Sequence, residues 1–472
     1  PVGGLRAMTA ARRCLCAVML LAAPLAAGEP GPLDFGEALR RMRAGNEALA
    51  AGGAEVRQRL EEGAAAKGLR APKVTVEARE TFLNDRINIE ADFLGLSYRV
   101  QEDQFMKGQV RVSWPVYTGG RIDAANAAAA AKTEEAAARL NHTDQQLVTE
   151  LARRYFGLRL AREAADVAAL KTAAMERHHR HAARLFGEGI IARVEALNAE
   201  VALANARAEQ SAAERDAAIA AEGLANALAD PSPGDPATPL FIVRDLEPGE
   251  WFQDAVERGH PALEALAALR RQAEEGVRAE KGAALPTVYL FGLRELFPND
   301  LTLLDPEWAA GVGGEYTLFD GGQAKHRTAA ARAEADRVRL LAQKARRDLR
   351  SLVAVRRQEA EKALEQHDAF GETLALAEEN LRVRMRAFEE GVATSVEVVD
   401  ASVSLARARL GRLKAAYDFD TALFGLLEAA GMTDAHGGYI ARGEPVDAPP
   451  PSVPPLDLPA SASPDPKETP AP

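Results

Sequence analysis

Hydrophobic and polar residues alternate in four short stretches of the chain. In one of them Val110, Val112 and Trp114 alternate with Arg111 and Ser113. Period-two alternation is typical of a β-strand with one apolar face, and about 9–11 such residues cross a membrane at a tilt in a β-barrel. We therefore predict four strands of this kind, at residues 72–82, 108–118, 286–295 and 308–319. The polar residues 84–107 are expected to form a long loop.

Helical patterns fill most of the remaining chain. Residues 34–70 have an amphipathic pattern that ends before Pro72, because proline removes a backbone donor. Residues 122–186 contain one glycine and no proline, which predicts a helix of about 95 Å at 1.5 Å per residue. Residues 323–390 predict a second long helix. Between Val396 and Tyr417 apolar residues recur at alternating steps of three and four, the heptad spacing of a coiled coil.

The chain repeats itself at a fixed offset. Gly119 and Gly321 are 202 residues apart (321 − 119), and the tyrosine two residues before Gly119 corresponds to Phe319 (319 − 117 = 202). The pairs Gly189 with Gly391 and Glu195 with Glu397 keep the same offset. Earlier in each copy the offset is 214, as between Pro72 and Pro286 (286 − 72). Two copies of one helix–strand–strand–helix–helix unit are predicted, because an internal repeat decides the architecture.

Composition divides the chain further. Residues 34–230 and 250–430 form the two repeats, and the proline-rich residues 231–249 are expected to form a linker. The tail from 444 to 472 is rich in proline and poor in large apolar residues, so we expect it to be disordered.

The first 28 residues are predicted to be a secretory signal peptide. They contain a basic start, an apolar run and small residues before a cleavage site, and they contain both cysteines, Cys14 and Cys16. Removing them takes away three arginines, so the net charge falls from −11 to −14 (−11 − 3). An acidic, cysteine-free, exported chain is not typical of a nucleic-acid-binding protein. No later stretch has the roughly 20 continuous apolar residues of a membrane-spanning helix.

Few residues of the sequence suggest catalysis or the binding of a metal or cofactor. His178, His179 and His181 stand at spacings of one and two on a predicted helix, so they do not share a face and are expected to be surface residues. We expect no metal site and no cofactor. The sequence contains no nucleophile elbow and no phosphate-binding loop, so we do not expect an enzyme.

The order of these elements, the duplication and the aromatic-x-Gly-Gly exit of the second strand together resemble the TolC-like outer-membrane efflux family. The resemblance covers residues 34–430. It implies a homotrimer with a periplasmic α-barrel that continues into a shared twelve-stranded membrane β-barrel. It also implies an outer-membrane location with a large periplasmic extension. The partners would be a periplasmic adaptor and an inner-membrane pump, and the role that of a passive efflux or type I secretion conduit gated at its periplasmic end.

The resemblance also assigns roles to residues. Acidic positions after the second hairpin tip would line a pore constriction, which points to Glu397 and Asp400 and, in the first repeat, to Glu195 and Asn198. From the residues alone these would be a solvated helix face. The tips would dock an adaptor through Gly189, Ala192, Arg193, Gly391, Ala393 and Thr394, although the two glycines also fit simple helix ends. Ala393 and Thr394 depart from the family, which often has a basic residue there. The strand-to-helix turns are Gly119–Gly120 and Gly321–Gly322.

Two alternatives are weighed against the channel. A periplasmic adaptor also contains long helical hairpins, but it carries one hairpin rather than a duplicated unit with four strands. A structural coiled-coil protein of the periplasm would explain the heptads, but not the alternating strands with Trp114, Tyr117 and Phe319 near their ends, where aromatic girdles of membrane barrels lie.

Overall fold

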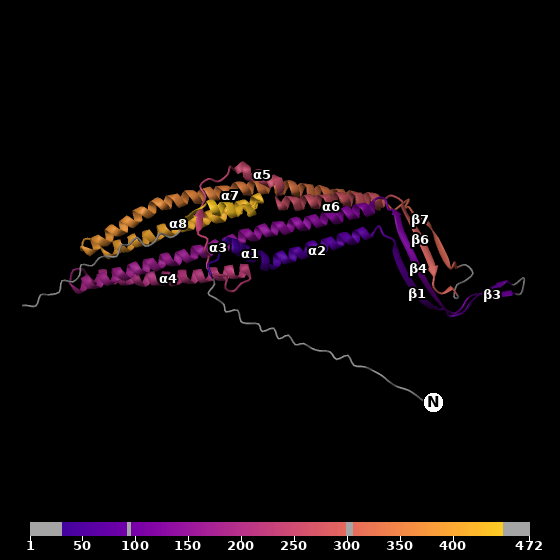
Figure 1. The fold of residues 1–472 in the computed structure, drawn as a ribbon, viewed down its shortest axis with the longest axis horizontal. Coiled ribbons are helices and arrows are strands. Elements are labelled where there is room, and N and C mark those ends of the chain that lie inside the picture. Colours follow the sequence, from indigo (N-terminus) through magenta and orange to yellow (C-terminus); the bar gives the residue numbers. More distant parts are fainter. Residues whose placement is uncertain (1–30, 92–95, 299–304, 447–472) are drawn as a thin grey trace, which may run out of the picture.

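A computed structural model describes residues 31–91, 96–298 and 305–446. The molecule is an elongated body of helices with a sheet at one end and two helical hairpin tips at the other (Figure 1). The predicted signal peptide and most of the predicted tail lie outside the described residues. None of the helices in the described ranges is both long and apolar enough to span a membrane.

The two halves of the chain share the order of their main elements, which is two helices, two strands of the large sheet and two long helices. The first half comprises α1 (Phe35–Gly45), α2 (Glu47–Gly68), β1 (Lys73–Phe82), β2 (Ile87–Ala91), β3 (Leu96–Gln101), β4 (Gln104–Tyr117), α3 (Arg121–Gly187) and α4 (Arg193–Leu228). The second half comprises β5 (Leu240–Ile242), α5 (Gly249–Gly259), α6 (Pro261–Ala283), β6 (Thr287–Glu295), β7 (Trp308–Glu315), α7 (Gln323–Glu389) and α8 (Ser395–Ala430). It ends with a short 3₁₀ turn (Thr433–Ala435), α9 (His436–Arg442) and β8 (Glu444–Val446).

The repeat offset extends to the element boundaries. Helices α7 and α8 begin 202 residues after α3 and α4 (323 − 121 and 395 − 193), and α5 and α6 begin 214 residues after α1 and α2 (249 − 35 and 261 − 47). The caps are also equivalent. The Asn46 side chain accepts from the Ala48 N–H, and Nδ1 of His260 accepts from the Ala262 N–H. Residues at these offsets can therefore be compared as equivalent positions.

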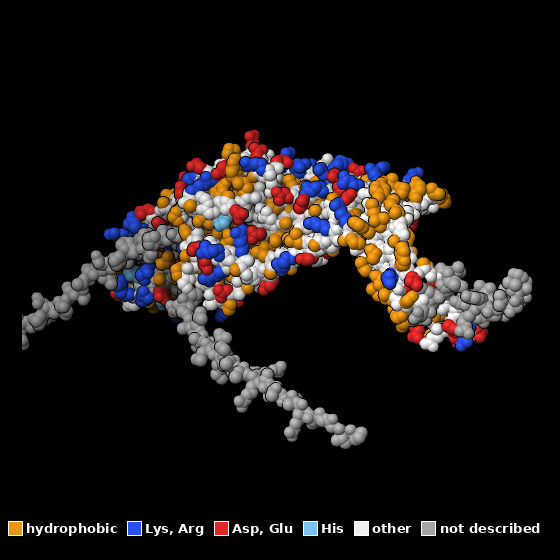
Figure 2. Space-filling model, turned by 45° about the vertical axis from the view of Figure 1, so that its right-hand side comes forward, with side chains coloured by type: hydrophobic (Ala, Val, Ile, Leu, Met, Phe, Trp, Pro, Cys, Tyr) orange, Lys and Arg blue, Asp and Glu red, His pale blue; other side chains and the backbone are white. Residues whose placement is uncertain are grey.

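The four predicted strands form one antiparallel sheet in the order β1-β4-β6-β7. Its register brings Val76 opposite Val110 and Trp114 opposite Leu290, so the apolar residues of neighbouring strands lie on one face. Thr75 lies opposite Arg111, which places polar residues of β1 and β4 on the other face. Figure 2 shows the hydrophobic side chains gathered over the strands, whereas the helical body carries many charged side chains. Among the described residues, β1 and β7 each pair on one side only.

The main core lies where the middle of α3 meets α1, β5, α5 and the second half of α8. Phe35 packs there between Tyr155, Phe156 and Phe424, with ring centroids 5.1–5.6 Å apart. The predicted linker contributes to this core, because Leu240, Phe241 and Ile242 of β5 are buried.

Three predictions about irregular segments were wrong in part. The predicted linker 231–249 contains β5, and the first three residues of the predicted tail form β8, which pairs antiparallel with β5. The predicted loop 84–107 contains the hairpin of β2 and β3. In all three segments the paired strands satisfy one another's backbone donors and acceptors. In a loop these groups would have to form hydrogen bonds with water.

Some side chains at the predicted heptad positions of α8 are more exposed than the core side chains of a coiled coil are expected to be. Val396 and Leu410 are exposed in this chain, and small residues such as Ala401 and Ala408 are buried instead. Gly411 lies against the ring of Phe370, where a Cβ would come 2.5 Å from a ring carbon. The contact between α7 and α8 is therefore too close for large residues on both sides.

Candidate functional site: the two helical hairpin tips

Both hairpins turn through the same backbone motif at the end far from the sheet (Figure 1). In the first, the Gly189 N–H donates to the Phe186 carbonyl and the Ile190 N–H to the Leu185 carbonyl, at 3.0 and 2.9 Å. The corresponding bonds in the second run from Gly391 to Phe388 and from Val392 to Ala387, again at 3.0 and 2.9 Å. This pattern is a Schellman motif, which ends a helix with one left-handed residue.

The predicted tip residues occupy matching places around these motifs. Gly189 and Gly391 have φ of +74° and +76°. Ala192 and Thr394 are the N-caps of α4 and α8, and the Thr394 hydroxyl accepts from the Glu397 N–H. Arg193, the first residue of α4, is exposed.

Glycine is required at the two tips because the backbone φ is positive, and not because a side chain would clash with a neighbour. No atom lies within 4 Å of a Cβ built on Gly189, and the nearest to one on Gly391 is an Ile190 methyl at 3.9 Å. Alanine at either position is expected to cost about 1 kcal/mol, because the left-handed conformation is strained for a residue with a Cβ.

Gly187 supplies the matched control, since it lies in α3 with open space around it and no positive φ. We expect Gly187→Ala to stabilise the protein by about 0.5–1 kcal/mol and Gly189→Ala to destabilise it, as measured by thermal unfolding. Equal effects of the two substitutions would contradict this interpretation.

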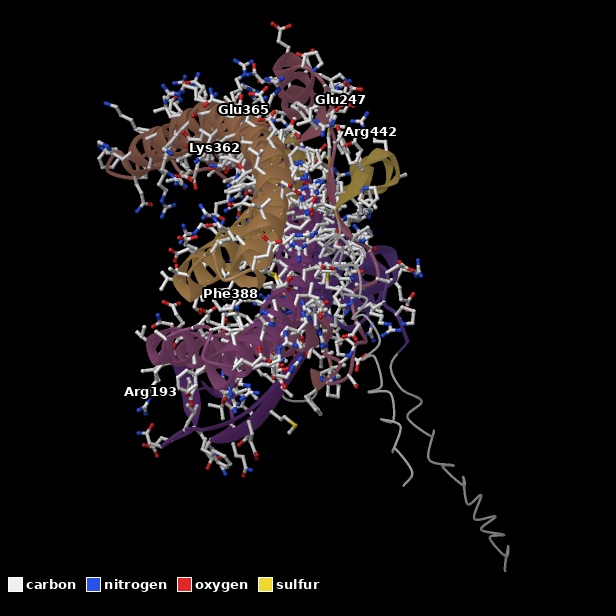
Figure 3. The ribbon with its side chains drawn as sticks, turned by 90° about the vertical axis from the view of Figure 1, so that its left-hand side faces the viewer. Arg193, Glu247, Lys362, Glu365, Phe388 and Arg442 are labelled. Carbon is white, nitrogen blue, oxygen red and sulfur yellow. The ribbon has the colours of Figure 1, made fainter. Side chains whose placement is uncertain are left out.

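A junction between the two hairpins lies directly behind the tips. Oε2 of Glu195 accepts from the Ser395 N–H at 2.7 Å, and Nε2 of His178 lies 2.6 Å from Oγ of Ser395. The ring of His178 packs on Phe388 with a centroid distance of 4.6 Å. Figure 3 shows Phe388 at the boundary between the hairpins and Arg193 on the side of the first hairpin away from the second.

His178 corrects the prediction of a surface histidine, because its side chain is 4% exposed. Burial, together with the neighbouring His181 and His179, lowers its pKa to about 4. The imidazole is therefore neutral at pH 7 and links α3 to the first turn of α8. Spacing along α3 does not indicate this role, since the partner Ser395 belongs to the other hairpin.

The predicted constriction residues differ in their surroundings. Glu195 faces the first turn of α8, and Glu397 forms an ion pair with Arg384 at 2.6 Å. The Asp400 carboxylate is exposed and has no hydrogen bond or ion pair within the described ranges, and Asn198 is half-buried. Two of the four side chains therefore hold helices together, whereas Asp400 presents a free carboxylate.

The strand-to-helix turns lie at the opposite end of the long helices. Gly119, Gly120, Gly321 and Gly322 all have positive φ, between +62° and +86°. In the second turn both Asp320 carboxylate oxygens accept backbone N–H groups, from Gly322 and from Ala324. In each repeat this turn lies between a strand of the sheet and the start of a long helix.

Comparisons with known proteins agree with this architecture. Protein CyaE of Bordetella pertussis is 29% identical over 335 residues, which cover 68% of this chain and 70% of that protein. The outer membrane protein VceC from Vibrio cholerae superposes with a TM-score of 0.72 at 14% identity, over 84% of this chain and 96% of VceC. The MtrE outer membrane channel of Neisseria gonorrhoeae, in its open state, superposes with a TM-score of 0.68 at 19% identity, over 84% and 89% of the two chains.

Because the sequence identities to these two solved structures are only 14% and 19%, the superpositions show a shared fold and nothing further. A family model described as outer membrane efflux protein matches residues 38–230 and 251–432, which include both repeats, both tips and the whole four-stranded sheet. This chain belongs to the outer membrane efflux protein family.

Proposed function

We propose that three copies of this chain form one passive export conduit from the periplasm to the outside, without enzymatic activity. The family consists of outer-membrane efflux channels that work with adaptor and pump partners. The observation that carries the proposal is the sheet β1-β4-β6-β7, which has an apolar face and two outer edges without a partner strand in the described ranges. Open edges in lipid leave backbone groups unsatisfied, so four strands per chain must close a ring with other copies.

The native mass of protein extracted from an isolated outer-membrane fraction tests this assembly. We expect a detergent-stable trimer. A water-soluble monomer in the periplasm would contradict the proposal, because the strands would then never enter lipid. That result would favour the structural coiled-coil alternative, whereas the adaptor alternative is not supported by a duplicated unit with four strands.

The hairpin tips are the proposed docking site for the periplasmic adaptor. Gly189, Ala192 and Arg193 border one tip, and Gly391, Ala393 and Thr394 border the other. Both tips expose apolar side chains, Ile190 at 58% and Val392 at 77%, although they lie at the water-facing end of the helices. Exposed apolar residues of this kind are typical of surfaces that bind another protein.

The same end of the helices is the proposed gate. Glu195, Asn198, Glu397 and Asp400 would form its constriction, with Asp400 facing the water path and the two glutamates fixing the spacing of the hairpins. Three symmetry-related Asp400 carboxylates would then form a ring, and rings of acidic side chains favour cations.

Neutralising this ring is expected to reduce cation preference. In planar lipid bilayers, Asp400→Asn combined with Glu397→Gln should bring the ratio of cation to anion permeability closer to one. Asp245→Asn, the same chemical change at an exposed position far from the tips, should leave the ratio unchanged. An unaltered ratio in the tip variant would remove these residues from the constriction.

A further inference from the structure

The second repeat carries aromatic side chains on the face of the sheet that does not meet lipid in the proposed channel. Trp114 lies opposite Leu290 on the apolar face, so strand alternation places the residues next to Leu290 on the other face. These residues are Tyr289 and Phe291 of β6. In the closed ring of the proposed channel they would line the interior, where side chains are generally polar.

The duplication shows that aromatic residues are not needed at these positions to build the sheet. The positions equivalent to Tyr289 and Phe291 are Thr75 (289 − 214) and Glu77 (291 − 214). Both lie on the corresponding face of β1, because they alternate with Val76, which belongs to the apolar face. The first repeat therefore forms the same strand with polar side chains, and the two rings of the second repeat need another explanation.

Both rings lie over glycine residues of the neighbouring strand β7. A Cβ built on Gly313 would lie 2.5 Å from Cζ of Tyr289, and one built on Gly311 would lie 3.0 Å from Cζ of Phe291. Neither glycine has a positive φ, so the overlying rings are what excludes a side chain there. The centroids of the two rings are 6.3 Å apart. The rings therefore form one aromatic surface that lies along the sheet, and we call this surface the aromatic strip.

Positive charge lies beside the aromatic strip. Ser113 of β4 is opposite Phe291 on one side and opposite Lys73 of β1 on the other, so only a serine separates this lysine from the ring. Arg111 lies on the same face, two residues from Ser113. Lys73 and Arg111 are exposed and form no ion pair within the described ranges. The Arg111 guanidinium donates to the Gln109 side-chain oxygen at 3.3 Å.

The carboxylates of this face are either farther from Phe291 or already bonded. In the strand register Glu77 lies opposite Gln109, and Glu315 lies opposite Thr287 at the end of the strip next to the helices. Glu295 is buried, and its Oε1 accepts from the Gly108 N–H at 2.6 Å. The aromatic strip is therefore flanked by positive charge on its β4 side and by negative charge only at its helical end.

We propose that the aromatic strip binds exported molecules that combine a planar aromatic ring with an acidic group. Aromatic rings stack on one another at centroid distances of about 4.5–7 Å, and these contacts add to simple apolar burial. Lys73 and Arg111 would bind the acidic group beside the stacked ring, because charge-assisted hydrogen bonds are stronger than neutral ones. The proposal rests on the proposed channel, since only a closed ring turns this face of the sheet towards an exported molecule.

A trimer would carry three aromatic strips at one level of the barrel. Tyr289 is the third residue of β6, so this level lies close to the junction of the sheet with the helices. Asp400 lies near the hairpin tips, at the far end of the helical body (Figure 1). Binding at the strip can therefore be measured separately from ion preference at the tips.

Equilibrium binding to the purified protein in lipid nanodiscs tests the proposal, with pyrene tetrasulfonate as the probe. This molecule is planar and aromatic, and its charge keeps it out of lipid. Its fluorescence anisotropy should rise on binding. We expect saturable binding that weakens as salt is added, because Lys73 and Arg111 are exposed to solvent. Cyclohexane tetracarboxylate, which has as many acidic groups but no aromatic ring, should compete poorly.

Leucine variants separate ring stacking from simple cover of the glycines. Tyr289→Leu with Phe291→Leu keeps apolar side chains over β7, and the affinity for the probe should fall roughly tenfold because the ring faces are lost. Tyr289→Phe with Phe291→Tyr keeps both rings and should keep the wild-type affinity. Trp308→Leu is the matched control, because it removes a ring from the opposite, apolar face of β7 and should leave the affinity unchanged.

A second pair of substitutions tests the charged side of the strip. Lys73→Gln with Arg111→Gln should lower the affinity for the probe several-fold and remove most of its dependence on salt. These residues belong to β1 and β4, so the rings and the glycines beneath them stay as they are. Phe291→Leu alone, with an expected loss of roughly threefold, gives the ring comparison if the double leucine variant does not assemble.

The native mass of each preparation separates the possible failures. A wild-type trimer that does not bind the probe overturns the aromatic strip as a binding site and leaves the channel proposal standing. Unchanged affinity in a trimeric leucine variant also overturns it, because binding would then be electrostatic only. A wild-type protein that stays monomeric overturns the channel proposal and, with it, the position of the strip inside a barrel.

Discussion

Acidification from pH 6.5 to about pH 4 is expected to destabilise this protein by about 3 kcal/mol for each of two buried histidines. Burial lowers the pKa of His178 and of His260 from 6.5 to about 4, and neighbouring histidines add to the shift. The two side chains are 4% and 1% exposed. A folded-state pKa below the unfolded one means that the unfolded chain takes up protons first, so stability is complete above pH 6.5 and is lost as pH falls towards 4.

The repeat itself supplies the variants for this test. The positions equivalent to His260 and His178 are Asn46 (260 − 214) and Asn380 (178 + 202), so asparagine suits both sites. His260→Asn keeps an acceptor for the Ala262 N–H and removes the titrating group. We expect each variant to lose about half of the acid sensitivity of thermal unfolding at fixed protein concentration, whereas His326→Asn, at an exposed site, should change nothing.

Wild-type unfolding that is flat between pH 6.5 and pH 4.5 would show that the two histidines are not buried as described. A variant that keeps the full acid sensitivity would exclude its own histidine. The two variants also report on acid sensitivity in two different regions of the protein. His178 lies at the tips, whereas His260 joins α6 to the end of α8 through the Glu428 carbonyl.

The regular part of the fold could be predicted from the sequence because it obeys periodic rules. Alternation predicts the strands of the sheet, and the constant offset predicts both tip glycines. The structural features at these sites, such as the left-handed turn at Gly391 or the alternating strand around Val112, depend on residues close in sequence. Local patterns therefore suffice there.

The remaining elements depend on contacts between distant segments. Strand β5 exists because β8, some 200 residues later, pairs with it (444 − 242 = 202), although its apolar run Leu240–Ile242 was a usable signal. The hairpin of β2 and β3 lies where the sequence predicts a loop, because Ile87 and Ile89 stand among polar residues. Helical spacing predicts a surface position for His178 because it carries no information about the second hairpin, which buries this side chain.

The buried carboxyl of Asp420 is expected to give the opposite pH dependence, because it makes the protein less stable as the pH rises above 3.8. Asp420 of α8 is fully buried, its Oδ2 accepts only a 3.4 Å bond from the Phe241 N–H, and its Oδ1 has no partner in the part of the chain that the structure describes. Burial raises the pKa of this carboxyl well above its ordinary 3.8. A raised folded-state pKa means that stability is complete below pH 3.8 and is lost as pH rises towards the folded-state pKa, by up to about 1.4 kcal/mol per pH unit.

Asp420→Asn is therefore expected to reduce the loss of thermal stability that accompanies rising pH. The unfolding temperature should increase most at pH 8, because an amide carries no charge into the core. Asp418→Asn is the matched control, since that side chain is 39% exposed and pairs with Lys414 on its own helix. Unfolding temperatures from pH 5 to pH 8 at one protein concentration give the comparison. If Asp420→Asn followed the wild-type curve, Asp420 would have to be ionised with a partner, and the packing of β5 on α8 would need revision. If the curve flattens, the charge-free form of Asp420 is what allows β5, and with it the start of the C-terminal tail, to pack against the helical body.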